Sequence, residues 1–317
     1  MATCKICGNT EQNKKYKIKE KAFGMGDEFN YILCANCGCL QIEKAPDDMS
    51  KYYPRGYYSF RGPSEKEAII KKMLRKCRDR YAIFGSGILG RLLYCFFPNV
   101  SLRSLSRLPI NKSWKILDVG CGSGALISSL YGLGFKNLLG VDPYIRPDIV
   151  SSGGYPILKK SLKDLKGSFD LIMFHHSFEH MEPVEALEAA AEHMLSDSFC
   201  LVRIPLSDSW AWKYYGVNWV QIDAPRHLFL HTQKSMKLLA ERAGLKIVDI
   251  VYDSTDLQFK GSEKYKRGMQ LYCSNGDGLF SKNRIFSWRE IMLFKKKARI
   301  LNIEQRGDQA SFYMKKV

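Results

Sequence analysis

Four cysteines near the start of the chain have the spacing of metal ligands. Two CxxCG motifs begin at Cys4 and at Cys34, and in each the second thiol is followed directly by a glycine. Such a tight turn aims both sulfurs at one point, and four thiolates complete the tetrahedral sphere of a structural Zn2+ ion, with no open position for a catalytic water. The sequence therefore predicts a zinc ribbon over residues 1–45. Its predicted ligands are Cys4, Cys7, Cys34 and Cys37.

A glycine-rich segment in the middle of the chain has the composition of a cofactor-binding loop. Residues 113–142 read as a buried strand, a run of three glycines, a helix and a second strand that ends at Asp142. Glycines allow the backbone to approach a ligand at a helix N-terminus, and an acid that closes the second strand can accept hydrogen bonds from both ribose hydroxyls. The pattern predicts a nucleotide-containing cofactor.

The residues of this loop carry a family resemblance. The run LDVGCGSG at 117–124, followed by Gly-Val-Asp at 140–142, closely resembles the S-adenosylmethionine signature of class I methyltransferases. Residues 169–183 resemble the fourth strand and following helix of the same family. The resemblance implies an S-adenosylmethionine-dependent enzyme. The cofactor-binding residues that it implies are Asp118, Gly120, Gly122, Gly124 and Asp142.

The same resemblance implies a fold for the rest of the chain. We expect an α/β, Rossmann-like, seven-stranded sheet in the order 3-2-1-4-5-7-6 over residues 113–317, with an insertion at about 253–309. The elements expected on this basis are strands over 115–119, 198–204, 245–252 and 310–316, and helices over 233–243 and 288–301.

The segment 205–231 leaves the predicted fifth strand at its carboxyl end, where open α/β sheets bind ligands. Within it, Asp-Ala-Pro-Arg-His-Leu at 223–228 resembles methyltransferases encoded among bacterial cell-surface polysaccharide genes, and more distantly the zinc-ribbon sugar C-methyltransferases. Transfer of a methyl group to a hydroxyl needs removal of a proton, and histidine suits that task, so His227 is the candidate general base. The alternative is a histidine that orders the loop. Arg226 stands where the C-methyltransferases have an acid, which favours methylation of oxygen.

Aromatic residues are concentrated in the same segment. Trp210, Trp212, Tyr214, Tyr215 and Trp219 fall within ten residues. Flat rings stack on sugar faces or bases, and they also pack beneath loops. The sequence leaves both interpretations open.

Residues 46–112 connect the two predicted domains. A Tyr-rich connection over 46–63 is expected to lack regular structure. A basic helix, capped by Ser64 and Glu67, then runs into an apolar stretch over 81–98. This stretch is interrupted by glycines and an arginine and is too short to span a bilayer. It could lie in a membrane interface or cap the core.

The charge of the chain is unevenly distributed. The 317 residues are 45% hydrophobic, as in folded proteins, and carry a net charge of +17. Residues 61–112 hold 12 Lys and Arg against 3 Asp and Glu, whereas 113–281 hold 18 against 19. The neutral core disfavours nucleic acid as a partner. The basic stretches either face solvent or meet an anionic membrane surface.

The sequence does not open with a secretory signal, so we expect a cytoplasmic protein with reduced cysteines, which can also work at the inner face of the membrane.

Together these features predict methyl transfer to a sugar hydroxyl of a glycan, nucleotide-sugar or lipid-linked saccharide, as part of polysaccharide biosynthesis. Two alternatives remain open at this point. One is an RNA methyltransferase with a zinc module, supported mainly by the net charge. The other is a non-catalytic, cofactor-binding scaffold in glycan assembly.

Overall fold

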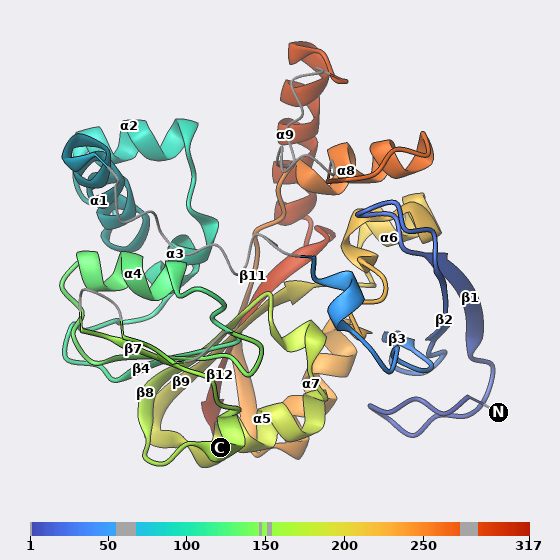
Figure 1. The fold of residues 1–317 in the computed structure, drawn as a ribbon, viewed down its shortest axis with the longest axis horizontal. Coiled ribbons are helices and arrows are strands. Elements are labelled where there is room, and N and C mark those ends of the chain that lie inside the picture. The colour runs from blue at the N-terminus through green and yellow to red at the C-terminus, as the bar shows by residue number, and fades with distance from the viewer. Residues whose placement is uncertain (1, 55–67, 146–147, 151–153, 273–284) are drawn as a thin grey trace. The chain divides into compact units, whose positions relative to one another are not determined.

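The computed structural model describes residues 2–54, 68–145, 148–150, 154–272 and 285–317 (Figure 1). Internal contacts divide the chain into two compact units. We call the unit of Met1–Gly56, Phe178–Leu187 and Arg203–Phe312 the ribbon unit, and that of Tyr57–Ser177, Glu188–Val202 and Tyr313–Val317 the glycine-loop unit. Each unit is therefore assembled from segments that are far apart in the sequence.

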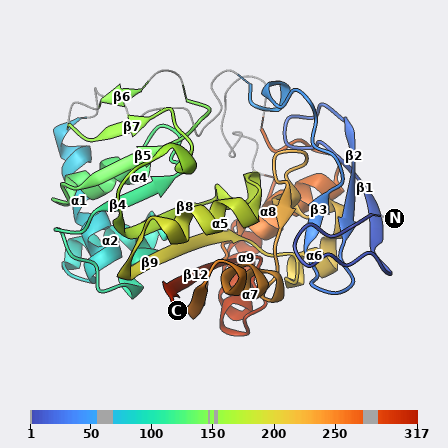
Figure 2. The ribbon, with the colours of Figure 1, turned by 90° about the horizontal axis from the view of Figure 1, so that it is seen from below.

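An eight-stranded sheet has the order β11-β12-β9-β8-β4-β5-β7-β6. Its strands are β4 (Ile116–Val119), β5 (Leu138–Val141), β6 (Ile149–Val150), β7 (Pro156–Leu158), β8 (Phe169–His175), β9 (Met194–Pro205), β11 (Leu245–Tyr252) and β12 (Gln309–Lys316). The central pairs β4–β5, β4–β8 and β5–β7 are parallel, and Figure 2 shows β7, β5, β4 and β8 side by side. Apart from the short antiparallel edge strand β6, this is the predicted order 3-2-1-4-5-7-6, which is confirmed.

The central strands are mainly apolar and mostly buried, as expected for parallel strands that are covered on both faces. All four residues of β4 are buried, and five of the seven residues of β8 are buried. The glycine loop leaves β4 and leads into α4 (Ala125–Gly132). The core of the glycine-loop unit thus fixes both ends of this loop.

A second sheet belongs to the ribbon unit and has the order β1-β2-β3-β10. The first three strands, β1 (Lys14–Lys19), β2 (Glu28–Leu33) and β3 (Leu40–Ile42), come from the predicted zinc ribbon. The fourth, β10 (Phe229–Leu230), comes from the segment that contains His227 and pairs antiparallel with β3. The ribbon therefore shares its sheet with the candidate substrate segment.

Helices complete the ribbon unit. Those wholly within it are α6 (Trp210–Tyr215), α7 (Gln233–Arg242), α8 (Leu257–Lys266) and α9 (Trp288–Ile303). Helix α5 (Pro183–Glu192) follows the single turn η5 (Phe178–His180). The structure confirms the expected helices over 233–243 and 288–301. Trp212 and Tyr215 are 7% exposed and Trp219 is fully buried in the core of this unit, so packing explains most of the aromatic cluster.

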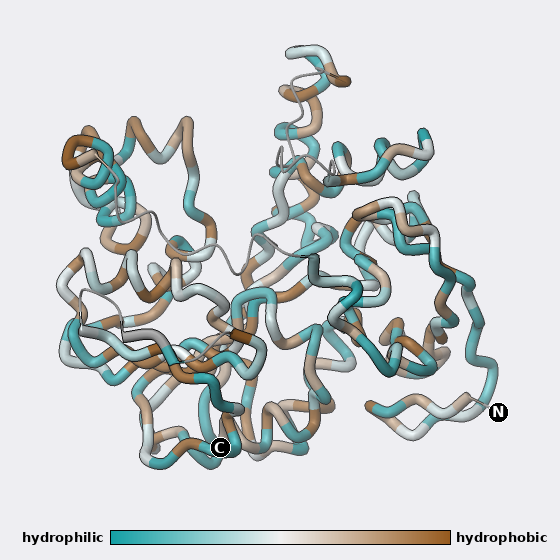
Figure 3. The backbone as a smooth tube through the Cα atoms, in the orientation of Figure 1, coloured by the Kyte–Doolittle hydropathy of each residue, from teal (hydrophilic) through white to brown (hydrophobic). Residues whose placement is uncertain are grey.

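The basic segment forms α1 (Ile69–Phe84), α2 (Ile88–Phe96) and α3 (Val100–Ser104). Helix α1 ends because Gly85 takes a left-handed conformation with φ of 67°. The expected cap at Ser64 and Glu67 lies outside the described residues. Hydrophobic colouring runs along most of α2 in Figure 3. Within the ranges that the structure describes, no helix combines the length and the apolar character needed to cross a membrane.

Candidate functional site

The four predicted zinc ligands lie together in the ribbon unit. The Sγ atoms of Cys4 and Cys37 are 3.6 Å apart, those of Cys7 and Cys34 are 3.5 Å apart, and all four lie within 4.8 Å of one another. A tetrahedron with Zn–S bonds of about 2.3 Å has sulfur–sulfur edges of about 3.8 Å. The donor set therefore fits one Zn2+ ion in a closed structural sphere.

The second cysteine motif is fixed by residues far along the chain. Gly38 has a φ of 74°, and a Cβ atom there would lie 2.9 Å from Cγ2 of Thr232. The Thr232 hydroxyl donates to the Cys37 carbonyl at 2.6 Å, and the Ser207 hydroxyl donates to the Gly38 carbonyl at 2.9 Å. Because Thr232 also caps α7, the metal motif is joined directly to the start of that helix.

The glycine loop has the backbone that its sequence predicted. Gly120, Gly122 and Gly124 have φ values of 71°, 53° and 77°, a region that residues with a Cβ rarely adopt. A Cβ atom at Gly124 would also overlap the Ile157 side chain of β7. Glycine therefore gives the loop this shape with the least strain, and at Gly124 a larger residue would also displace Ile157.

Asp142 and Asp118 flank the loop within the glycine-loop unit. One carboxylate oxygen of Asp142 accepts the backbone N–H of Gly122 at 3.0 Å, and the other accepts that of Tyr144 at 2.9 Å. Asp118 is 3% exposed, and its burial, together with the nearby charge of Asp142, raises its pKa to about 8. The five implied cofactor residues thus lie in one unit, whereas His227 lies in the other.

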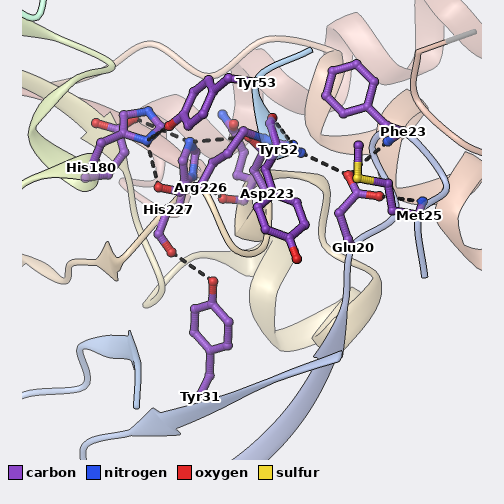
Figure 4. A network of polar contacts seen from close by, with 12 residues as sticks. Glu20, Phe23, Met25, Tyr31, Tyr52, Tyr53, His180, Asp223, Arg226 and His227 are labelled. Carbon is purple, nitrogen blue, oxygen red and sulfur yellow. Dashed lines mark hydrogen bonds and ion pairs between the residues drawn. The ribbon is translucent and has the colours of Figure 1, made fainter. Parts of the chain in front are cut away.

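His227 and His180 pack edge to face in the ribbon unit, with ring centroids 4.8 Å apart (Figure 4). Nδ1 of His227 lies 2.7 Å from the carbonyl oxygen of Gln221, and Nδ1 of His180 lies 2.7 Å from that of Arg226. A carbonyl can only accept, so both Nδ1 atoms carry hydrogen. In the neutral form, each ring then has its lone pair on Nε2.

Glu179 adds a carboxylate to the two imidazoles. Its side chain is fully buried, and Oε1 lies 3.8 Å from Nε2 of His227. Burial and the neighbouring charge of His227 lower the pKa of His180. One ligand atom from each of Glu179, His180 and His227 lies within 4.8 Å of the others. Such a group of acceptors can receive a proton from a substrate hydroxyl or hold a divalent metal ion.

Arg226 and its acidic partners hold the loop that presents His227. The guanidinium is fully buried and binds Asp223 through two hydrogen bonds of 2.8 and 2.7 Å. It also donates to the Tyr52 carbonyl at 2.9 Å and to Glu20 at 3.2 Å. Burial opposes ionisation of Asp223, but the charge and hydrogen bonds of Arg226 outweigh it and lower the Asp223 pKa to about 2. The loop is therefore held by a satisfied buried ion network.

Backbone hydrogen bonds fix the chain on both sides of this network. The N–H of Leu228 donates to the Glu179 carbonyl at 2.8 Å, and the Leu228 carbonyl accepts from Ile42 at 2.9 Å. The Tyr31 hydroxyl donates to the His227 carbonyl at 2.9 Å. The sequence singled out His227 as a candidate but did not indicate Glu20 or Tyr31, because no local motif connects them to it. The i, i+3 spacing of Asp223 and Arg226 was the available signal for their ion pair.

The comparisons with known proteins agree with the fold. A family model described as "Methyltransferase domain" matches residues 94–250. The chain is 26% identical over 184 residues to a tRNA U34 carboxymethyltransferase of Aeromonas salmonicida (strain A449), a region that is 51% of this chain and 54% of that protein. The chain thus spans about half the length of this curated relative.

Solved structures with similar folds include two from other organisms. An S-adenosylmethionine-dependent methyltransferase from Archaeoglobus fulgidus has 19% sequence identity to this chain and a TM-score of 0.43. The match covers 73% of this chain and the whole of the Archaeoglobus chain. The cyclopropane synthase MmaA2 from Mycobacterium tuberculosis has 13% sequence identity to this chain and a TM-score of 0.45. The match covers 80% of this chain and the whole of the MmaA2 chain. Taken with the family-model match and the sheet order, the glycine loop identifies this chain as a methyltransferase with a class I S-adenosylmethionine-dependent domain.

Proposed function

We propose that this enzyme methylates a hydroxyl group of a saccharide, with His227 as the general base. The saccharide is a glycan, a nucleotide-sugar or a lipid-linked sugar. The observation that carries the proposal is the hydrogen bond between Nδ1 of His227 and the Gln221 carbonyl. It directs the lone pair of a neutral imidazole to Nε2, on the side of the Glu179 carboxylate. A sugar hydroxyl needs such a base because it is hardly ionised near neutral pH.

S-adenosylmethionine, when bound, supplies an electrophilic methyl group. His227 would take the hydroxyl proton at Nε2 as the hydroxyl oxygen accepts the methyl group that the cofactor gives up. The carboxylate of Glu179, 3.8 Å from Nε2, stabilises the imidazolium that results. The Gln221 carbonyl keeps a hydrogen on Nδ1 and fixes the orientation of the ring before and after proton transfer. The glycine loop and Asp142 are the proposed binding groups for the cofactor.

A saccharide acceptor is supported by features of the ribbon unit and of the sequence. Tyr214 is 59% exposed and stacks on Trp210 with ring centroids 4.5 Å apart. Exposed rings of this kind stack on the apolar faces of sugars. The likeness of residues 223–228 to polysaccharide-associated methyltransferases points to the same substrate class. The near-zero charge of residues 113–281 also gives this part of the chain no general attraction for a polyanion.

A structural zinc ion completes the proposal. Four thiols within 4.8 Å of one another, two of them supplied by each CxxCG turn, form a donor set without an open position. The ion holds the ribbon together and does not contact the reacting atoms.

RNA is the second candidate acceptor. The similarity to a tRNA-modifying enzyme and the net charge of +17 favour it. A ribose hydroxyl of RNA would need a base as well, so the geometry of His227 does not separate the two acceptors. The similarity covers 54% of that relative, however, and the basic residues are concentrated outside residues 113–281.

Turnover of methyl-labelled S-adenosylmethionine separates these acceptors. The full chain is incubated in parallel with nucleotide-sugars, with lipid-linked saccharides and with total tRNA, and His227→Ala serves as the inactive control. We expect label in a saccharide fraction as a methyl ether, which mass spectrometry of the hydrolysed sugar identifies. Label in tRNA, or a carbon-bound methyl group in the sugar, would contradict the proposal.

A further inference from the structure

Helix α2 turns its apolar side chains away from its neighbour. Gly90 faces α1, because a Cβ atom there would overlap the carbonyl oxygen of Cys77 and lie 2.9 Å from Cβ of Tyr81. An α-helix turns by about 100° per residue, so Ile88 and Leu92 lie on the side opposite Gly90. The close contact at Gly90 therefore fixes which face of α2 points outward.

This outward face is unusually exposed for its composition. Ile88 is 91% exposed, Phe96 71%, Phe97 66% and Leu92 57%. A surface helix in water normally buries its apolar stripe and exposes its polar one. Large apolar side chains gathered on an exposed surface mark an interaction site.

The same helical segment is strongly basic. Residues 69–107 contain nine Lys and Arg and a single acid, Asp79. Asp79 is 2% exposed and accepts hydrogen bonds from Arg78 and Asn99. The negative charge of Asp79 is therefore buried and does not offset the exposed basic side chains of this segment. On α1, Lys72 and Lys76 are exposed, and the first two residues of that helix, Ile69 and Ile70, are 78% and 73% exposed.

We propose that α1 and α2 form an interfacial anchor that binds this protein reversibly to an anionic lipid bilayer. Apolar side chains on a short helix enter the headgroup and acyl boundary, while basic side chains bind anionic headgroups. If a second copy of the chain bound here, two basic surfaces would face each other and repel. A nucleic acid would pair with the basic groups but leave the apolar face in water. A bilayer satisfies both kinds of side chain, and this proposal does not depend on the identity of the methyl acceptor.

Vesicle co-sedimentation of the full chain tests the anchor. One set of vesicles is neutral phosphatidylcholine and the other contains phosphatidylserine in addition. We expect binding to the anionic set that weakens at high salt. The triple variants Ile88→Ser/Leu92→Ser/Phe96→Ser and Lys72→Gln/Lys76→Gln/Arg80→Gln should each lower the fraction bound at least tenfold. All six side chains are exposed, so thermal unfolding and S-adenosylmethionine affinity should remain as in the wild type.

Matched controls come from the ribbon unit. Lys14→Gln/Lys17→Gln/Lys246→Gln removes the same charge from exposed positions. Met292→Ser/Leu293→Ser/Ile303→Ser replaces side chains on α9 that are 57%, 63% and 83% exposed. Both controls should bind vesicles as the wild type does. The anchor would be refuted by equal recovery with neutral and anionic vesicles, by no recovery with either, by binding lost only in the controls, or by α2-dependent self-association in solution without lipid.

Discussion

The Tyr31 hydroxyl donates a hydrogen bond of 2.9 Å to the backbone carbonyl of His227. Tyr31 is fully buried on β2, three residues before Cys34, and burial raises its pKa, so the hydroxyl stays protonated. Two residues beyond His227, Phe229 pairs with Gln41 of β3. The proposed zinc ion and the proposed base are therefore coupled through one small sheet, and loss of the metal should displace the histidine.

Replacement of one zinc ligand tests this coupling. In Cys34→Ser, we expect the zinc content to fall from about one per chain to near zero, because three thiolates hold the ion much less tightly. Turnover should fall at least tenfold, while S-adenosylmethionine affinity stays close to that of the wild type, since the glycine loop belongs to the other unit. Metal analysis, activity and calorimetry measure the three quantities. Cys95→Ser, at an exposed cysteine, is the control, and retained zinc in Cys34→Ser would contradict the ligand assignment.

The features that the sequence predicted are those encoded locally. Each cysteine motif spans a single turn, and the glycine loop lies between a strand and a helix that are adjacent in sequence. Their geometry follows from spacing and from the backbone freedom of glycine. The sheet order came from the family resemblance, because a pattern of apolar residues does not by itself specify which strands pair.

The features that the sequence did not predict depend on contacts between distant segments. Pairing of β3 with β10 brings residues 41 and 229 together. Arg226 binds Glu20, which is similarly far away in the sequence. A two-residue strand such as β10 has no periodicity to detect. The aromatic cluster was ambiguous for a related reason, since burial of Trp219 depends on packing partners from elsewhere in the chain.

His227→Ala tests the assignment of the base. We expect turnover to fall by about 10^2 to 10^4, as for the loss of a general base, with little change in S-adenosylmethionine affinity. Zinc content should remain at about one per chain. A second metal ion in the wild type that His227→Ala lacks would instead show that Glu179, His180 and His227 hold an ion. His193→Ala is a matched control, because Nδ1 of His193 also lies 2.7 Å from a carbonyl, that of Gly167. Unchanged turnover in His227→Ala would leave the histidine with a role in ordering the loop only.

Arg226→Gln should destabilise the ribbon unit strongly. The change leaves Asp223 and the buried Glu20 without their cationic partner, a situation that costs about 3 to 5 kcal/mol. The pKa of Asp223 is about 2 in the folded chain and about 3.9 in the unfolded chain. Its ionisation therefore stabilises the fold fully when the pH is above about 3.9, and this contribution is lost as the pH falls through 2. The variant should therefore differ most from the wild type at neutral pH and least near pH 2. Urea unfolding at several pH values measures this, and a difference that does not change with pH would contradict it.

Asp142→Ala tests the cofactor site. Loss of charge-assisted hydrogen bonds to ribose should weaken S-adenosylmethionine binding by about 1.5 to 3 kcal/mol per bond. The loop should also loosen, because Asp142 accepts the Gly122 N–H at 3.0 Å. Calorimetry measures the affinity, and hydrogen exchange of residues 120–124 reports the loop. Asp170→Ala is the control. The Asp170 carboxylate accepts the backbone N–H of Lys115 and not an N–H of the glycine loop. An unchanged dissociation constant in Asp142→Ala would place the ribose elsewhere.

Asp118 should make the stability of the chain depend on pH in the direction opposite to Asp223. Its pKa is raised to about 8 in the folded state, against about 3.9 when unfolded. Between these values the folded chain holds a proton that the unfolded chain has released, so this group's contribution is complete below about pH 4 and is lost as the pH rises through about 8. Asp118→Asn has a similar shape and does not titrate. The stability of the variant relative to the wild type should therefore rise between pH 5 and pH 7.5, on the order of 1 kcal/mol per pH unit. Denaturant unfolding at the two pH values decides this: an unchanged difference between the proteins would mean that Asp118 is ionised in the folded chain, in spite of its burial beside Asp142.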